Sequence, residues 1–197
     1  MIRAAIPADV PAVHALIRDL ARYEKLEDQH VGTADALREH LFGARRYCEA
    51  LVALDAGADA SADANASAGA GAGAGASASA SASADVHADA SAGATGRVVG
   101  FALFFHNYST FLAQPGIYLE DLFVLPTARR RGHGRALLAA VARLALERGC
   151  GRFEWSVLRW NEPAIRFYES LGAAPLDEWG LFRLAGDALA SLARLAR

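Results

Sequence analysis

Apolar residues recur every three or four positions over residues 10–24, VPAVHALIRDLARYE, and this spacing predicts a helix with one buried face. Asp9 stands directly before that run as a candidate N-cap. A second helix is expected from Thr33 to Gly43. The apolar runs at 2–5 and 47–55 predict strands on either side of these two helices.

The second half of the chain carries more closely spaced apolar runs. Strands are expected over 96–109, 116–126, 153–160 and 181–186, with Gln114, Pro115 and Gly116 in a hairpin turn between the first two. Helices are expected over 135–149, 161–172 and 187–197, the second capped by Asn161 and the third by Asp187. This order of elements favours an α/β fold in which a mixed sheet carries helices on both faces.

Residues 56–95 interrupt the pattern with a segment composed almost entirely of Ala, Gly, Ser and Asp. Its small-residue alternation is also seen in silk-like strands. A single copy without large side chains cannot offset the entropy of ordering, so we expect a disordered insertion within one domain spanning 1–197.

Composition and charge exclude several classes of protein. A net charge of −2 and a pI of about 6.3 disfavour a general nucleic-acid-binding surface. No apolar run reaches membrane-spanning length, and the N-terminus lacks the apolar core of a signal peptide, so a cytoplasmic protein is expected. The two cysteines, Cys48 and Cys150, form no metal-binding motif, and no metal is expected.

The segment ARRRGHGRALLAAV, residues 128–141, combines arginines and glycines with the start of a helix. A dinucleotide-binding loop is excluded because the third glycine position holds Leu137, and a P-loop lacks its Gly-Lys-Ser/Thr. Free amides at a helix start, with arginines beside them, still suit a phosphate group. From these residues alone, a phosphate-bearing ligand, a nucleic-acid backbone and a solvated basic helix start remain open.

The run Arg129-Arg130-Arg131-Gly132-His133-Gly134 has the R/Q-x-x-G-x-G/A form of the acetyl-CoA loop of GCN5-related N-acetyltransferases (GNAT). Together with ARYEKLED, YLEDLFV and WNEPAIRFYESLGA, the chain resembles the diamine (spermidine/spermine) and thialysine acetyltransferases of that superfamily. Departures are Arg130, where relatives often have Gly, Ala164, where a hydroxyl residue is common, and the insertion. The resemblance implies a mostly antiparallel sheet of about six to seven strands with a splayed cofactor-binding strand pair.

The resemblance also implies an acetyl-CoA site and a homodimer, with no nucleic acid or membrane as partner. The residues it assigns to acetyl-CoA are Leu122, Phe123, Val124, Arg129, Arg130, Arg131, Gly132, His133, Gly134, Arg135, Asn161, Glu162, Pro163, Ala164 and Tyr168. Those it assigns to a small cationic amine are Tyr23, Glu24, Glu120, Glu154, Trp155 and Ser156.

Acetyl transfer to an amine needs a base, an oxyanion donor and an acid. An alkyl ammonium has a pKa near ~10.4, so it must lose a proton before it attacks. Alternation along a strand lets only one of Glu120 and Asp121 face the cleft, and family positions assign the base to Glu120. Family positions also assign the oxyanion donor to the Val124 amide and the acid to Tyr168.

Each assignment has a plainer alternative in the residues themselves. Glu120 and Asp121 could be solubilising charges at a sheet edge, and Tyr168 could be a core residue. For the whole chain, the alternative to direct transfer from acetyl-CoA in a ternary complex is a non-catalytic acyl-CoA-binding or regulatory module.

Overall fold

The computed structural model describes residues 1–55, 72–73 and 96–196. Its strands are β1 (Ile2–Ala4), β2 (Glu49–Asp55), β3 (Ala72–Gly73), β4 (Arg97–Ser109), β5 (Gln114–Val124) and β6 (Phe153–Trp155). Its helices are α1 (Val10–Glu24), α2 (Ala34–Phe42), α3 (His133–Glu147), α4 (Glu162–Glu169) and α5 (Gly186–Ala193). Short 3-10 turns cover Pro7–Asp9, Glu27–Gln29 and Pro126–Ala128. Apart from β3, the predicted insertion lies outside the described residues.

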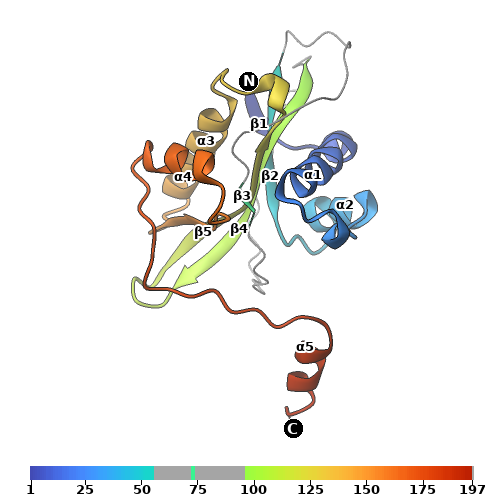
Figure 1. The fold of residues 1–197 in the computed structure, drawn as a ribbon, viewed down its shortest axis with the longest axis vertical. Helices are drawn as coiled ribbons and strands as arrows, with labels where there is room; N and C mark the ends of the chain where they lie inside the picture. Colours follow the sequence, from blue (N-terminus) through green and yellow to red (C-terminus); the bar gives the residue numbers. More distant parts are fainter. Residues whose placement is uncertain (56–71, 74–95, 197) are drawn as a thin grey trace.

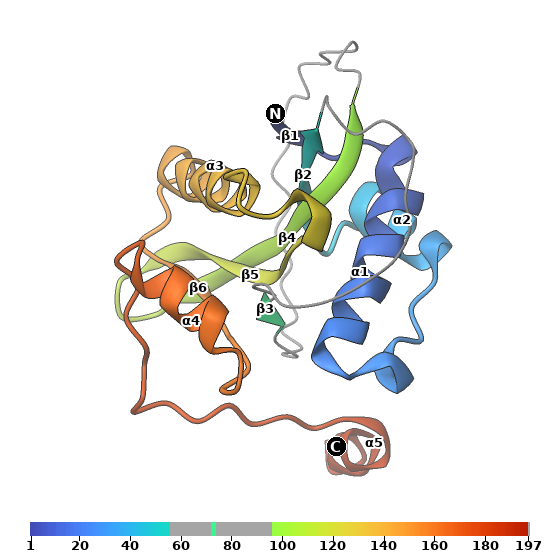
Figure 2. The same cartoon turned by 45° about the horizontal axis from the view of Figure 1, so that its top comes forward.

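The strands form one mixed sheet in the order β1-β2-β4-β5-β3, and β6 also pairs with β5. The β5–β6 pair is parallel and every other pair is antiparallel. Helices α1 and α2 cover one face of the sheet, and α3 and α4 cover the other (Figures 1 and 2). The predicted fold class is therefore confirmed, with six strands at the lower end of the expected range.

Each face of the sheet buries its own apolar cluster. Val13, Leu16 and Leu20 of α1 meet Phe101 and Phe123 of the sheet on one face. On the other face, the buried side chains of α3 and α4 pack on those of β4 and β5. The buried residues of α3 are Leu137, Leu138, Val141 and Ala145, which follow the helical spacing read from the sequence. Strand β5 lies between the two clusters and contributes to both.

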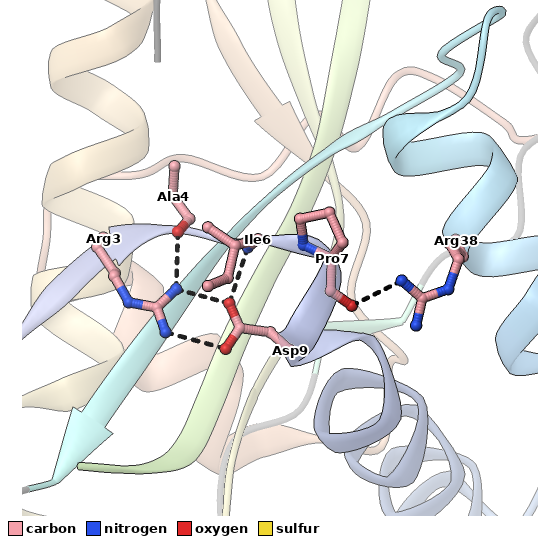
Figure 3. A network of polar contacts seen from close by, with 6 residues as sticks. All are labelled: Arg3, Ala4, Ile6, Pro7, Asp9 and Arg38. Carbon is pink, nitrogen blue, oxygen red and sulfur yellow. Dashed lines mark hydrogen bonds and ion pairs between the residues drawn. The ribbon is translucent and has the colours of Figure 1, made fainter. Parts of the chain in front are cut away.

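Asp9 is not the side-chain cap that its position suggested. Its carboxylate accepts hydrogen bonds from the two terminal nitrogens of Arg3, at 2.6 and 2.9 Å, and from the backbone N–H of Ile6 at 2.8 Å (Figure 3). Arg38 of α2 donates to the Pro7 carbonyl beside it. This network ties β1 and α2 to the start of α1.

Four other predictions were wrong in detail. Gln114, Pro115 and Gly116 belong to β5, because the turn of the hairpin lies one step earlier, over 110–113. Residues 156–160 do not continue β6, and 181–186 form no strand. Helix α5 is preceded by Ala185, and Asp187 lies inside it without capping it.

The C-terminal segment leaves the body of the molecule after α4 and ends in α5 (Figure 1). No residue of α5 is buried, and Phe182 is 95% exposed. Residues 181–186 therefore pair with no strand among the described residues, and a strand pattern forms a strand only where a neighbouring edge completes its hydrogen bonds.

Candidate active site

Strand β5 loses its neighbour halfway along its length. Strand β6 pairs with it only from Ile117 to Leu119, while β5 continues to Val124. The predicted splayed pair is therefore present between β5 and β6. The two-residue strand β3 pairs with the same side of β5, opposite Leu122 and Asp121.

A β-bulge lies at the point where the two strands part. Leu103 of β4 pairs with Asp121 and the next residue, Phe104, pairs with Leu119, so Glu120 is the extra residue on β5. Between these two pairs, β5 therefore has one residue more than β4. The bulge breaks the alternation on which the choice between Glu120 and Asp121 depended.

The bulge allows both carboxyls to belong to one acidic cluster with Glu24, the last residue of α1. Burial, then the charges of Glu120 and Glu24, raises the pKa of Asp121 to about 8. Burial raises the pKa of Glu24 to about 7. Burial and the charges of both β5 carboxyls also raise the pKa of the Cys48 thiol to about 12. The bulge therefore removes the reason for expecting only one of these two carboxyls to face the cleft.

The burial of Glu24 predicts a pH-dependent loss of stability. Because its folded-state pKa is raised, its contribution is fully present below its unfolded pKa of about 4.3 and is lost as the pH rises through about 7. Over that window the loss is up to about 3 kcal/mol. We expect Glu24→Gln to raise the melting temperature at about pH 8 and to change it little at about pH 4.5. Glu147→Gln, on the exposed end of α3, is the matched control and should move neither value.

Tyr168 lies on the buried face of α4. Its side chain is 3% exposed, and its hydroxyl has no hydrogen-bond partner among the described residues. Burial, followed by the negative charge of Glu24, raises its pKa well above the ordinary value of a phenol. The Glu24 charge thus reaches Tyr168 although the two helices cover opposite faces of the sheet, which brings the predicted acid to the acidic cluster.

The arginine loop leads from β5 into α3, whose N-cap is Gly132 with φ of +82°. Arg130 has φ of +63°, a left-handed conformation that glycine adopts more readily than other residues. The first amides of α3, at His133, Gly134 and Arg135, are the free donors expected at a helix start. This backbone suits a phosphate group.

The arginines of the loop take different directions. Arg129 turns inward, where its Nε donates to the Val124 carbonyl at 2.8 Å. Arg131 forms an ion pair of 2.6 Å with Asp55, the last residue of β2, and His133 lies 3.9 Å from the same carboxylate. The side chains of Arg130 and Arg135 remain exposed.

Helix α4 begins as the sequence predicted. Asn161 is fully buried and its side-chain oxygen accepts from the Ala164 N–H, while Pro163 lies in the first turn. Ala164 is fully buried beneath the helix. Glu162 instead is exposed and pairs with Arg166 at 2.9 Å, so its side chain points away from the core.

The structure places the residues predicted to line the acceptor pocket in different parts of the molecule. Glu24 belongs to the acidic cluster, but the Tyr23 hydroxyl donates to Asn161 at 3.1 Å. Trp155 contacts Tyr168 with ring centroids 5.0 Å apart, on the α3 and α4 face of the sheet. The neighbouring residues of β6 point elsewhere, because successive side chains of a strand alternate.

Glu154 and Ser156 join a polar group that sequence reasoning missed. Glu154 accepts from Asn107 at 2.8 Å and pairs with Arg152 at 3.0 Å, and Ser156 shares a hydrogen bond of 2.8 Å with Tyr118. Asn107 and Arg152 belong to no motif, and Tyr118 begins the YLEDLFV motif without having been assigned a role. Only strand register brings these residues beside Glu154 and Ser156.

The Val124 amide points toward the splay. The Leu125 N–H donates to the Val99 carbonyl of β4. Because N–H groups alternate in direction along an antiparallel strand, the N–H of the preceding residue, Val124, points away from β4. The same alternation directs the Leu122 amide to that side, while the side chains of both residues remain in the core. The edge of β5 therefore offers backbone donors next to the acidic cluster.

Among the described residues, no three His, Cys, Asp or Glu side chains gather as a group able to hold a metal ion. No helix in the same part of the chain is long and apolar enough to cross a membrane.

The model of the acetyltransferase (GNAT) family matches residues 78–173. The chain is 37% identical to L-ornithine N5-acetyltransferase NATA1 of Arabidopsis thaliana, over 98% of this chain and 88% of that protein. The chain therefore belongs to the GNAT family, and it is a GNAT-type N-acetyltransferase.

Two further comparisons agree with this assignment. The chain is 34% identical to the thialysine N-epsilon-acetyltransferase of Bos taurus, over 98% of this chain and 96% of that protein. Among solved structures, an integron cassette protein from the mobile metagenome of V. cholerae superposes with a TM-score of 0.67 at 20% identity, covering 98% of this chain and 97% of that one. The superposition on the integron cassette protein supports the fold alone.

Proposed function

We propose that the protein moves the acetyl group of acetyl-CoA directly to a primary amine of a small cationic acceptor, within a ternary complex. The observation that carries the proposal is the buried hydroxyl of Tyr168, which has no partner among the described residues and lies within reach of the Glu24 charge. A buried hydroxyl without a partner costs free energy, and such a cost is retained where a ligand completes the site.

Acetyl-CoA fits the side of the site formed by β5, the arginine loop and α4. The amides at the start of α3 suit its pyrophosphate, with Arg130 and Arg135 exposed beside them. The edge of β5 at Leu122 and Val124 offers backbone donors to its pantetheine arm. The first turn of α4, from Asn161 to Ala164, closes the other side.

The acidic cluster supports a cationic acceptor. Glu24, Glu120 and Asp121 place three carboxyls at one end of the sheet, where a diamine, a polyamine, thialysine or a lysine-like amine would be attracted. The names of two relatives, which act on L-ornithine and thialysine, point to the same class of acceptor.

Three groups of the chain would carry the chemistry. Glu120 binds the ammonium and takes its proton, directly or through a water, so that the amine can attack the thioester carbon. The Val124 amide donates to the oxygen that becomes negative. Tyr168 donates its proton to the departing thiolate as the carbon–sulfur bond breaks, because a phenol is protonated at neutral pH and therefore has a proton to give.

A thiol-release assay with acetyl-CoA tests this function. The acceptor panel contains diamines, polyamines, L-ornithine, thialysine, lysine and aminoglycosides, and thiol release with any of them supports the proposal. Acetyl-CoA binding without thiol release for any amine would instead identify a non-catalytic acyl-CoA-binding module.

Strand β3 shares an edge with the proposed coenzyme site. It pairs with β5 at Leu122 and Asp121, so a pantetheine arm bound to Leu122 must take the place of β3. We expect replacement of 56–95 by a short Gly/Ser turn to lower the Michaelis constant for acetyl-CoA about fivefold, the equivalent of one net hydrogen bond. An unchanged constant, measured by thiol release beside the full chain, would place the coenzyme away from Leu122.

We also propose that the protein forms a homodimer through its C-terminal segment. Large apolar side chains are exposed along it at Leu176, Trp179, Leu181, Phe182, Leu184, Leu189, Leu192 and Leu195. Such a surface calls for a covering partner, and a second copy would cover both segments at once. Sedimentation should give a dimer for the full chain and a monomer for a chain ending at Pro175, whereas Leu146→Ser, an exposed site on α3, should remain dimeric.

A further inference from the structure

Tyr23 connects the end of α1 to Asn161 at the start of α4, 138 positions further along the chain. Its ring lies at the end of α1, one residue before Glu24, and its hydroxyl donates to the side-chain oxygen of Asn161 at 3.1 Å. Its ring also contacts Trp160, with centroids 5.8 Å apart. The side chain that the resemblance assigned to the acceptor is therefore bonded to the start of α4.

Asn161 is the cap on which α4 depends. The same side-chain oxygen that accepts from Tyr23 also accepts, at 3.4 Å, from the Ala164 N–H, which donates to the Asn161 backbone carbonyl at 3.0 Å as well. Asn161 is fully buried. The Tyr23 hydroxyl thus holds the amide of Asn161 in its capping orientation. A cap is important for a helix of eight residues, since a helix this short has little stability of its own.

Tyr168 lies on the face of α4 that this cap orients. It follows Asn161 by seven positions and Ala164 by four, so all three lie along one side of the helix. Its hydroxyl finds no described partner to hold it in place. The position of that hydroxyl consequently depends on packing and on the orientation of α4.

Arg129 fixes the ring of Tyr23 from the other side. Its guanidinium carbon lies 5.5 Å from the centre of the Tyr23 ring and 5.4 Å from that of Phe123. Its Nε donates to the carbonyl of Val124. Tyr23 is therefore held between the edge of β5 and the first turn of α4, the two elements proposed to bind acetyl-CoA.

We propose that Tyr23 is a positioning residue: it couples the acceptor helix α1 to the cap of α4 and so orients Tyr168 for proton donation, without contacting the acceptor. The inference rests on the proposed function of Tyr168. It assigns Tyr23 to the acid step of the reaction, whereas the adjacent Glu24 belongs to amine binding.

Tyr23→Phe tests this role because it removes the hydroxyl and keeps the ring between Arg129 and Trp160. We expect kcat to fall about fivefold, the equivalent of one hydrogen bond, with the Michaelis constant of the amine unchanged. A raised Michaelis constant at unchanged kcat would make Tyr23 an acceptor contact and overturn the inference. Tyr108→Phe, which removes an exposed hydroxyl on β4, is the matched control and should leave both constants unchanged.

A double-mutant cycle separates positioning from general stability. If Tyr23 acts through Tyr168, the loss caused by Tyr23→Phe disappears once Tyr168 is already Phe. Fully additive losses would overturn the inference, because they would mean that Tyr23 acts elsewhere.

Hydrogen exchange at the Ala164 amide provides a readout that needs no activity. We expect this amide to exchange about fivefold faster in Tyr23→Phe, because the cap of α4 is loosened. Unchanged exchange would contradict the inference even in an active enzyme. Faster exchange in a protein that releases no thiol with any amine would support the contact between Tyr23 and the cap of α4. The same result would refute the proposed function instead.

Discussion

Phenylalanine in place of Tyr168 is expected to lower turnover at least tenfold and up to about 10²-fold, the lower range for loss of a general acid. The affinity for acetyl-CoA should stay nearly unchanged, because the ring and its contact with Trp155 remain. Steady-state thiol release gives the turnover, and calorimetric titration with acetyl-CoA gives the affinity. Tyr47→Phe, on the exposed end of the chain leading into β2, is the control that should retain full activity.

The stability of the same variant distinguishes a catalytic hydroxyl from a packing residue. Since the Tyr168 hydroxyl is buried without a described partner, its removal should leave the melting temperature unchanged or raise it. Lower activity in a protein of equal or greater stability is the pattern of a site that trades stability for function. Wild-type turnover with wild-type affinity would reduce Tyr168 to a core residue of α4.

Local periodicity was enough to predict the elements that face the core. Helices α1 and α3 follow from apolar residues at helical spacing, and their buried positions agree with that spacing. Asn161 could be identified as a cap, and Thr33 as the start of the second helix, because helix-start signals act within one helix turn. These features depend on residues a few positions apart, which a single sequence displays directly.

Pairing between distant segments could not be predicted in the same way. Residues 181–186 have a strand pattern but no partner edge among the residues that the structure describes, and β6 stops after Trp155 while β5 continues. The bulge at Glu120 depends on the register between β4 and β5, which no local pattern encodes. For that reason, strict alternation along β5 predicted that only one carboxyl faces the cleft, whereas in the structure Asp121 also belongs to the acidic cluster.

The direction of long side chains was also beyond local reasoning. Three successive arginines suggested three phosphate contacts, yet Arg129 turns inward to Val124 and Arg131 pairs with Asp55. Asp55 lies near the arginine loop because of the order of strands in the sheet, which the local sequence around the arginines does not show. The glycine loop itself could be predicted, because backbone amides at a helix start need no particular side chain.

Glutamine in place of Glu120 is expected to lower kcat/KM for the amine by about 10²-fold near neutral pH, where the acceptor arrives protonated. The amide keeps the size of the side chain but can neither take the proton nor attract the ammonium. The raised pKa values of Glu24 and Asp121 make these neighbours poor substitutes, because both are partly protonated in that range. We therefore expect Glu120, rather than either neighbour, to act as the base at neutral pH.

The dependence of this loss on pH identifies its cause. As the pH approaches the amine pKa of about 10.4, free amine becomes available from solution, so the difference between the variant and the wild type should shrink. A loss of equal size at every pH would assign Glu120 to charge attraction alone. Glu147→Gln, on the exposed end of α3, is the control: removal of a carboxylate outside the acidic cluster should leave the pH profile unchanged. A base at Glu120 thus predicts a pH-dependent defect, and only the position at the bulge should produce it.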